Sequence, residues 1–136
     1  MPFLQVHTGR NLSTDAKRAL GTALASAYGE LMQTSRLIVN VGFVQYGEGD
    51  LARYDGEGGA PREMAIVTVD VRAGRTAAQV EMVGRTLAAV CAGALSIGEE
   101  RLAVYITEHA GQHIFRDGGR PPDRTGPRRK RPALGI

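Results

Sequence analysis

The apolar and polar positions of the chain follow the same order twice. The first run begins with the apolar segment MPFLQV, continues over 14–32 with apolar residues three or four positions apart, and ends with LIVNVGFV. The second run begins with MAIVTVDV, continues over 76–95 with the same spacing, and ends with RLAVYIT. Short apolar runs are typical of buried strands and the three-to-four spacing is typical of an amphipathic helix, so the pattern predicts two β-α-β units. The helical positions are Leu20, Leu24, Tyr28 and Leu31 in the first unit and Val80, Val83, Leu87 and Val90 in the second.

The two units, at about 1–46 and 64–107, align with each other when one is shifted by about 63 residues. Such self-similarity indicates a duplication. A helical crossover joins parallel strands with a right-handed sense. We therefore expect an α+β fold, in which duplicated β-α-β units form a four-stranded mixed sheet with two helices on one face. The aligned pairs include Val6 with Val69, Gly21 with Gly84, and Leu24 with Leu87.

The second face of this sheet is also expected to be covered. Apolar residues occupy both alternating sets of positions over 37–44, so both faces of that strand are at least partly buried. Association between subunits would supply the missing layer. The connection between the units, YGEGDLARYDGEGGAPRE at 46–63, has five glycines and no periodicity, which favours a lid or a subunit contact.

Composition and charge narrow the class of protein. A chain of 136 residues that is 43% hydrophobic and 23% charged fits one globular domain, which we place at 1–118. The net charge of +3 is uneven, because the segment 119–136 carries six basic residues and one acid, which leaves −2 on the rest. A basic, proline-rich tail without its own core is expected to pack on a neighbouring subunit, and no nucleic-acid or membrane partner is implied.

The sequence also predicts the compartment and the state of its thiol. No secretory signal pattern opens the chain and no apolar stretch is long enough to span a bilayer, so a cytoplasmic protein is expected. Cys91 is the single cysteine and lies four residues after Leu87 on the helical stripe. An internal disulfide is therefore excluded, and Cys91 is predicted to be a core residue.

Three residues carry the candidate chemistry. Removal of the initiator methionine would expose Pro2 as a secondary amine, and an α-amino group, with a pKa near ~8, can serve as a base close to neutral pH. In VRAGRTAAQ, Arg72 and Arg75 stand directly before the second predicted helix. Guanidinium groups beside the unpaired N–H groups of a helix start suit a carboxylate or a phosphate. The sequence therefore predicts a base and an anion site.

The opening proline, the repeated β-α-β unit and the arginine pair together resemble the tautomerase superfamily. The closest resemblance is to the cis-3-chloroacrylic acid dehalogenase branch, through RNLSTDAKRALGTALASAY, VRAGRTAAQ and LAVYITE, and it covers about the first 118 residues. This resemblance implies a homotrimer that needs no cofactor. It also implies that Pro2 is the catalytic group, that Arg72 and Arg75 bind a carboxylate, and that Tyr105 is a catalytic residue that helps to position water or substrate.

Two positions differ from the dehalogenase pattern. The histidine of the family's first helix falls on Tyr28, and its water-activating glutamate falls on Arg116. An arginine stays protonated and cannot take a proton from water, which disfavours dehalogenation unless Asp117 or Glu108 substitutes. Tyr28 is either a substrate-binding residue or a core residue that continues the helical stripe.

These residues favour a tautomerase of the 4-oxalocrotonate or phenylpyruvate type. Pro2 would be the general base that converts a 2-hydroxy-2-enoate to a 2-oxo acid, and the arginine pair would bind the carboxylate. The enzymatic alternatives are low-level cis-3-haloacrylate hydration or dehalogenation and decarboxylation of a 3-oxo acid.

A non-catalytic, trimeric ligand-binding module with the order β-α-β-β-α-β is the alternative from another class. An RNA-binding module of that order is disfavoured, because MAIVTVDV has no aromatic residue for base stacking. The histidines His7, His109 and His113 lack a zinc-binding spacing, so no metal is expected.

Overall fold

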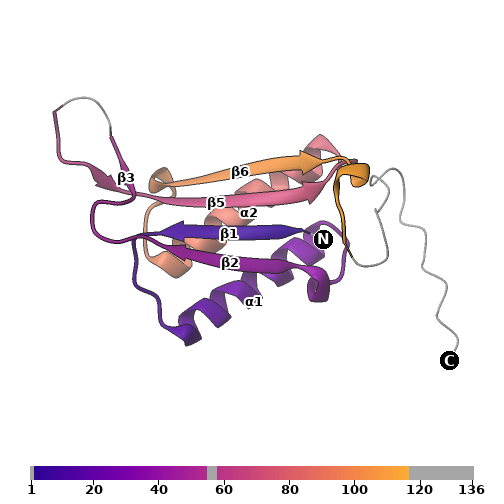
Figure 1. Cartoon of the computed structure of the whole chain (residues 1–136), viewed down its shortest axis with the longest axis horizontal. Helices are drawn as coiled ribbons and strands as arrows, with labels where there is room; N and C mark the ends of the chain where they lie inside the picture. The colour runs from indigo at the N-terminus through magenta and orange to yellow at the C-terminus, as the bar shows by residue number, and fades with distance from the viewer. Residues whose placement is uncertain (1, 55–57, 117–136) are drawn as a thin grey trace, which may run out of the picture.

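The computed structural model describes residues 2–54 and 58–116. A sheet with two helices packed on one of its faces makes up the domain (Figure 1). The elements are β1 (Phe3–Thr8), α1 (Thr14–Leu31), the 3-10 turn η1 (Arg36–Ile38), β2 (Asn40–Gln45), β3 (Ala52–Arg53), β4 (Arg62–Glu63), β5 (Ala65–Arg72), α2 (Ala77–Leu95), η2 (Glu99–Arg101), β6 (Leu102–His109) and η3 (Gly111–His113).

The main sheet has four strands in the order β2-β1-β5-β6. Within each unit the strands are parallel, β1 with β2 and β5 with β6, while the two units meet where β1 runs antiparallel to β5. The mixed sheet with both helices on one face confirms the predicted α+β fold. Strands β3 and β4 form a separate two-stranded sheet in the connection between the units, which the sequence pattern did not predict.

Each helix is preceded by a residue whose side chain caps it. Ser13 Oγ accepts a hydrogen bond from the Ala16 N–H at 3.1 Å, and α2 begins with a capping box in which Thr76 and Gln79 exchange hydrogen bonds. Both caps satisfy N–H groups that a helix leaves unpaired at its start. The helices therefore have defined starts, and that of α2 lies directly after the turn that carries Arg75.

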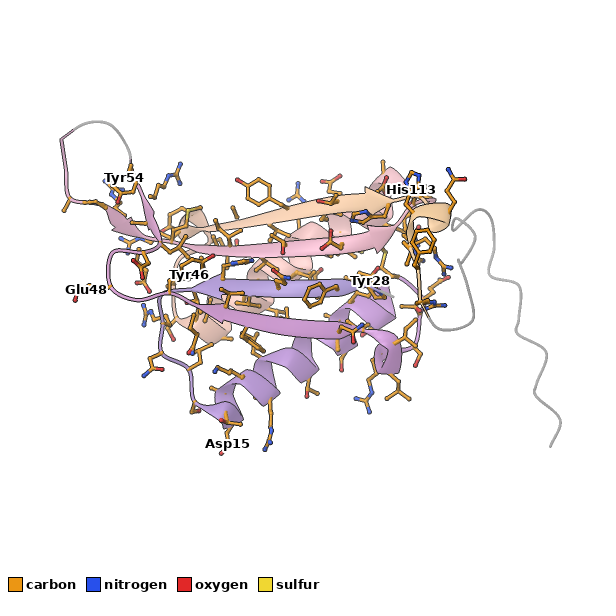
Figure 2. The ribbon with its side chains drawn as sticks, viewed as in Figure 1. Asp15, Tyr28, Tyr46, Glu48, Tyr54 and His113 are labelled. Carbon is orange, nitrogen blue, oxygen red and sulfur yellow. The ribbon has the colours of Figure 1, made fainter. Side chains whose placement is uncertain are left out.

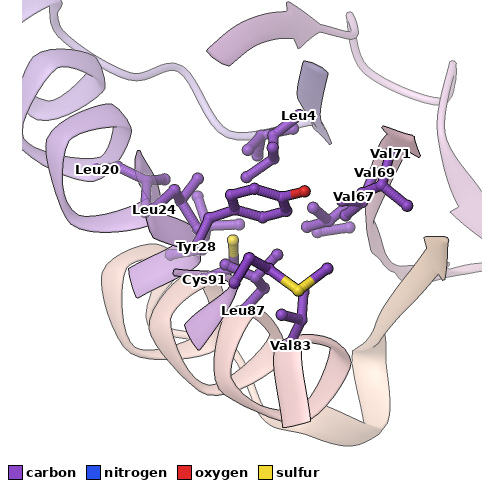
Figure 3. Close-up of a cluster of buried hydrophobic side chains, with 14 residues drawn as sticks. Leu4, Leu20, Leu24, Tyr28, Val67, Val69, Val71, Val83, Leu87 and Cys91 are labelled. Carbon is purple, nitrogen blue, oxygen red and sulfur yellow. The ribbon is translucent and has the colours of Figure 1, made fainter. Parts of the chain in front are cut away.

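The core lies between the helices and the sheet face that they cover (Figure 3). Burial alternates along β5, where Val67, Val69 and Val71 are buried and the residues between them are half-buried. Most of the predicted helical stripe is buried, namely Leu20, Leu24, Tyr28, Val83 and Leu87, while Leu31, Val80 and Val90 are half-buried. Cys91 is buried as well, which confirms its place in the core. Burial raises the pKa of the Cys91 thiol to about 12, so the thiol stays protonated and unreactive.

The opposite face of the sheet is open in the single chain. Large side chains on it remain exposed, among them Phe3 at 37%, Val44 at 39% and Tyr105 at 59%. No helix within 2–54 and 58–116 has the length and apolar character that a membrane crossing needs. The basic segment 119–136 lies outside the described residues, so its packing on a neighbour stays a prediction.

Candidate functional site

Pro2 is held at one end of the sheet by the start of β1. Its carbonyl accepts a hydrogen bond from the Asn40 N–H at 3.1 Å, which ties it to the start of β2, and the residue is buried. Because β1 runs antiparallel to β5, with Phe3 opposite Asp70, this end of the sheet is also where β5 reaches Arg72. The N-terminus, the end of β5 and the end of α1 therefore meet at one edge of the domain (Figure 1).

Arg72 and Arg75 are placed by the turn between β5 and α2. Arg72 is the last residue of β5, and Gly74 takes a φ of 105°, a left-handed conformation that favours glycine and lets the chain turn toward α2. Arg75 is half-buried, and its Nη1 donates a hydrogen bond of 2.5 Å to the carbonyl of Met32, the residue that caps the end of α1. This bond draws the start of α2 and the end of α1 together.

These elements enclose a small pocket of about 20 Å³. A volume of that size holds roughly one water molecule, so a bound acid requires the side chains at the pocket to shift. Pro2, Arg72, Arg75 and Tyr28 all line this pocket, so the structure brings together four of the five residues that the sequence singles out. The complete lining is Pro2, Tyr28, Thr34, Ile38, Arg72, Arg75 and Arg116.

Tyr28 belongs to both the core and the pocket. Only 2% of the residue is exposed, and Figure 3 shows its ring between Leu4 of the sheet and the side chains of both helices. It lies at the pocket end of the domain (Figure 2), and it also lines the pocket. The two interpretations of Tyr28 are therefore compatible, because a core ring forms one wall of the site.

Thr34 is a pocket residue that the sequence analysis missed. It follows α1 and is only 8% exposed, yet its Oγ1 has no hydrogen-bond partner within the part of the chain that the structure describes. Buried hydroxyl groups are nearly always paired, so this one needs an explanation. A short polar residue just after a helix gives no sequence signal of its own, because such residues usually serve as turns or caps.

Arg116 lies in the pocket at the position where the dehalogenase pattern has a glutamate. None of the described residues that line the pocket is a carboxylate. Glu108 instead lines a separate shallow hollow beside α2, with Arg75, Val80 and Glu81 among its neighbours, and Asp117 lies outside the described residues. The described part of the pocket thus combines three guanidinium groups with Pro2 and offers no acid to activate water.

Tyr105 is not brought to the pocket of its own chain. It lies in the middle of β6 opposite Thr68 and is exposed on the open face, four residues before the position that pairs with Arg72. Four residues of a strand span roughly 13 Å, which is more than a tyrosine side chain can reach. A role for Tyr105 in catalysis therefore depends on contact with another subunit.

Two of the three histidines have hydrogen-bond partners outside the pocket. The Nδ1 atom of His7 lies 2.8 Å from the Tyr46 hydroxyl, and Nε2 of His109 lies 2.8 Å from Asp70 Oδ1. His113 is exposed. No group of three or more metal-ligating side chains occurs among residues 2–54 and 58–116.

Comparison with known proteins identifies the fold. No model of a protein family matches the sequence, and no curated protein matches it. A fused 4-OT, described as a wild-type symmetric trimer, is 26% identical with a TM-score of 0.75 over 86% of this chain and 93% of that chain.

Two further solved structures extend the likeness. A member of the cis-3-chloroacrylic acid dehalogenase (cis-CaaD) family is 22% identical with a TM-score of 0.77, over 89% of this chain and 84% of that one. The FG41 malonate semialdehyde decarboxylase inhibited by 3-bromopropiolate is 20% identical with a TM-score of 0.68, over 86% and 91%. As the sequence resemblance predicts, the chain has the fold of the tautomerase superfamily, and a cis-CaaD family member is among its structural neighbours.

Proposed function

We propose that the protein is a tautomerase that converts 2-hydroxy-2-enoates to 2-oxo acids, with the amine of Pro2 as its general base. The observation that carries this proposal is the pocket in which Pro2 lies together with Arg72, Arg75 and Arg116. A base and several guanidinium groups around one small cavity suit a substrate that carries a carboxylate next to an ionisable oxygen.

The reaction moves one proton. The neutral nitrogen of Pro2 takes the proton from the enol O–H, the electrons form the C2 carbonyl as the double bond to C3 is lost, and the protonated amine then delivers the proton to C3. Arg72 and Arg75 hold the carboxylate and stabilise the negative charge that develops on the C2 oxygen. Cations close to an amine disfavour its protonated form, so the guanidinium groups also help to keep Pro2 neutral.

The other enzymatic functions differ from tautomerisation in the proton transfer that they require. Hydration or dehalogenation of a 3-haloacrylate needs a base that takes a proton from water, and the described lining has an arginine, Arg116, and no carboxylate for that step. Decarboxylation of a 3-oxo acid would require Pro2 to act in its protonated form, so its rate would rise toward acid pH. Tautomerisation, in contrast, should gain rate as the amine is deprotonated.

We also propose that the enzyme is a homotrimer. The fused 4-OT structures that resemble this chain are described as trimers, and the open sheet face exposes Phe3, Val44 and Tyr105. A contact on that face would bury these apolar side chains. It is also the arrangement that would let Tyr105 of one subunit reach the site of another.

The test follows ketonisation of phenylenolpyruvate and 2-hydroxymuconate by ultraviolet absorbance, using untagged protein whose N-terminal mass is confirmed. One residue added before Pro2 turns its nitrogen into a tertiary amide, which has no basic lone pair, so this variant should lose all activity. Pro2→Ala keeps an amine but changes its position, and a clear loss of rate is expected. Pro61→Ala, at an exposed proline, serves as the matched control and should keep the full rate.

Equal rates in the extended and unextended proteins would remove Pro2 as the base. If the unextended protein does not exceed the buffer blank for either substrate, the tautomerase proposal fails and the non-catalytic binding module becomes the better interpretation.

A further inference from the structure

The Thr34 hydroxyl is a buried polar group without a partner in the described part of the chain. The residue is 8% exposed, and Oγ1 neither donates nor accepts a hydrogen bond there. A hydroxyl withdrawn from water without a compensating bond lowers the stability of a protein. The hydroxyl of the next residue, Ser35, does have a partner, because its Oγ accepts a hydrogen bond from the Leu37 N–H.

The backbone of Thr34 is fixed by the end of α1. Gln33 takes a left-handed φ of 49°, the Thr34 N–H donates to the Gly29 carbonyl at 2.9 Å, and the Gln33 N–H donates to the Glu30 carbonyl at 3.4 Å. These two bonds form a Schellman motif, which closes the helix. Threonine is also branched at Cβ, so its side chain has few rotamers. The fixed backbone therefore leaves the hydroxyl only a small number of directions in which to point.

Thr34 lines the same pocket as Pro2, Arg72 and Arg75. We infer that Thr34 is a substrate-binding residue whose hydroxyl donates a hydrogen bond to an oxygen of the bound 2-hydroxy-2-enoate. This inference rests on the proposed function, since that function supplies the anionic oxygen beside the arginines. A donor whose partner arrives only with the substrate explains why a buried hydroxyl is left unpaired in the protein alone.

Thr34→Val tests this role, because valine keeps the shape of threonine and removes only the hydroxyl. If the hydroxyl serves the substrate, kcat/KM should fall by about 10- to 100-fold, as for the loss of one hydrogen bond to a charged group. The urea midpoint should stay unchanged or rise, since no protein hydrogen bond is removed. Thr34→Ser, which keeps the hydroxyl, should retain most of the activity.

Thr8→Val is the matched control. Thr8 is also buried, at 1% exposure, but its Oγ1 accepts a hydrogen bond of 2.9 Å from the Arg10 N–H at the opposite end of β1. This control should lower the urea midpoint and leave kcat/KM unchanged, which is the reverse of the result for Thr34→Val. A rise in KM alone would place the Thr34 bond on the substrate carboxylate, and a fall in kcat would place it on the C2 oxygen, where charge develops.

A wild-type kcat/KM in Thr34→Val would overturn the inference, as would a midpoint that falls as it does in Thr8→Val. If the wild-type protein does not catalyse ketonisation, calorimetric titration with phenylpyruvate separates the two proposals. Weaker binding by Thr34→Val than by wild type would then support the Thr34 contact while the catalytic proposal fails. Equal binding by both, or no binding by either, would reject the Thr34 contact.

Discussion

Substitution of Gly29 by alanine should destabilise the protein, although the same change at Gly21 in the same helix should stabilise it. A Cβ atom added at Gly29 would lie 2.9 Å from the Thr34 carbonyl oxygen and 3.1 Å from the Arg36 backbone nitrogen. Both neighbours are backbone atoms held by the chain reversal after α1, so neither can move aside easily. At Gly21 the added Cβ would lie 3.8 Å from the Phe43 ring, an ordinary contact.

The expected magnitudes follow from these contacts. Alanine is better than glycine within a helix by about 1 kcal/mol, and this gain applies at both positions. At Gly29 it is opposed by about 1–3 kcal/mol for overpacking and by about 1 kcal/mol for the Thr34 to Gly29 hydrogen bond that the displacement weakens. We therefore expect Gly29→Ala to lose about 1–3 kcal/mol of unfolding free energy, and Gly21→Ala to gain about 0.5–1 kcal/mol.

Urea denaturation at one fixed chain concentration measures both changes, because the stability of an oligomer depends on concentration. The slope of the transition should match wild type, so that the midpoint alone reports stability. Gly29→Ala should also lower kcat/KM for phenylenolpyruvate, since the displaced segment carries Thr34 away from the pocket. A midpoint for Gly29→Ala at or above that of Gly21→Ala would refute the claim that the close approach after α1 is rigid.

Two further predictions concern the charge of the pocket and the buried thiol. Arg116→Gln should lower kcat/KM more for 2-hydroxymuconate, which has two carboxylates, than for phenylenolpyruvate, which has one. The two losses should differ by about 2- to 5-fold, as expected for one partly screened ion pair. Equal losses for both substrates would contradict this role. The pKa of Cys91 is raised to about 12 in the folded state, so deprotonation of this thiol favours the unfolded chain. The free energy of unfolding should therefore be unaffected by this group below pH ~9 and should fall as the pH rises toward 12. Cys91→Ala should lack this part of the alkaline decline in urea midpoint, and a thiol reagent at pH ~8 should label wild type only when urea is added.

Most of the fold is predictable because each half of the chain combines two clear patterns. Short apolar runs indicate the strands, and apolar residues three or four positions apart indicate the helix. The apolar run MAIVTVDV predicts β5, and the three-to-four spacing predicts α1 and α2. Strands β3 and β4 could not be predicted, because each has two residues and a period needs more. The bidentate pair of Arg10 with Glu63 of β4 is likewise a long-range contact that no local pattern predicts.

The site was predictable only in part, for a physical reason. Pro2, Arg72 and Arg75 have chemistry that can be recognised from the residue type and its place in the chain. Thr34 becomes a candidate only because its buried hydroxyl has no hydrogen-bond partner in the described part of the chain. That property depends on the three-dimensional positions of the surrounding atoms, which the sequence does not give. Tyr105 shows that a suitable residue type in the expected strand is not enough to place a residue in the site. It lies on the open face of the sheet and not in the pocket of its own chain.

At Arg75 the proposed function favours an arginine over a lysine, although both side chains carry the same charge. Its Nη1 already donates to the Met32 carbonyl, which holds the end of α1 against the start of α2, and the same side chain lines the pocket. A guanidinium has five N–H donors in a rigid planar fork, so it can hold that carbonyl and still present other donors to a carboxylate. The single ammonium of a lysine would have to serve both partners from one point. Under the proposed function, Arg75 would couple the packing of the two helices to the binding of the substrate, and both roles would depend on the geometry of the fork as well as on the positive charge.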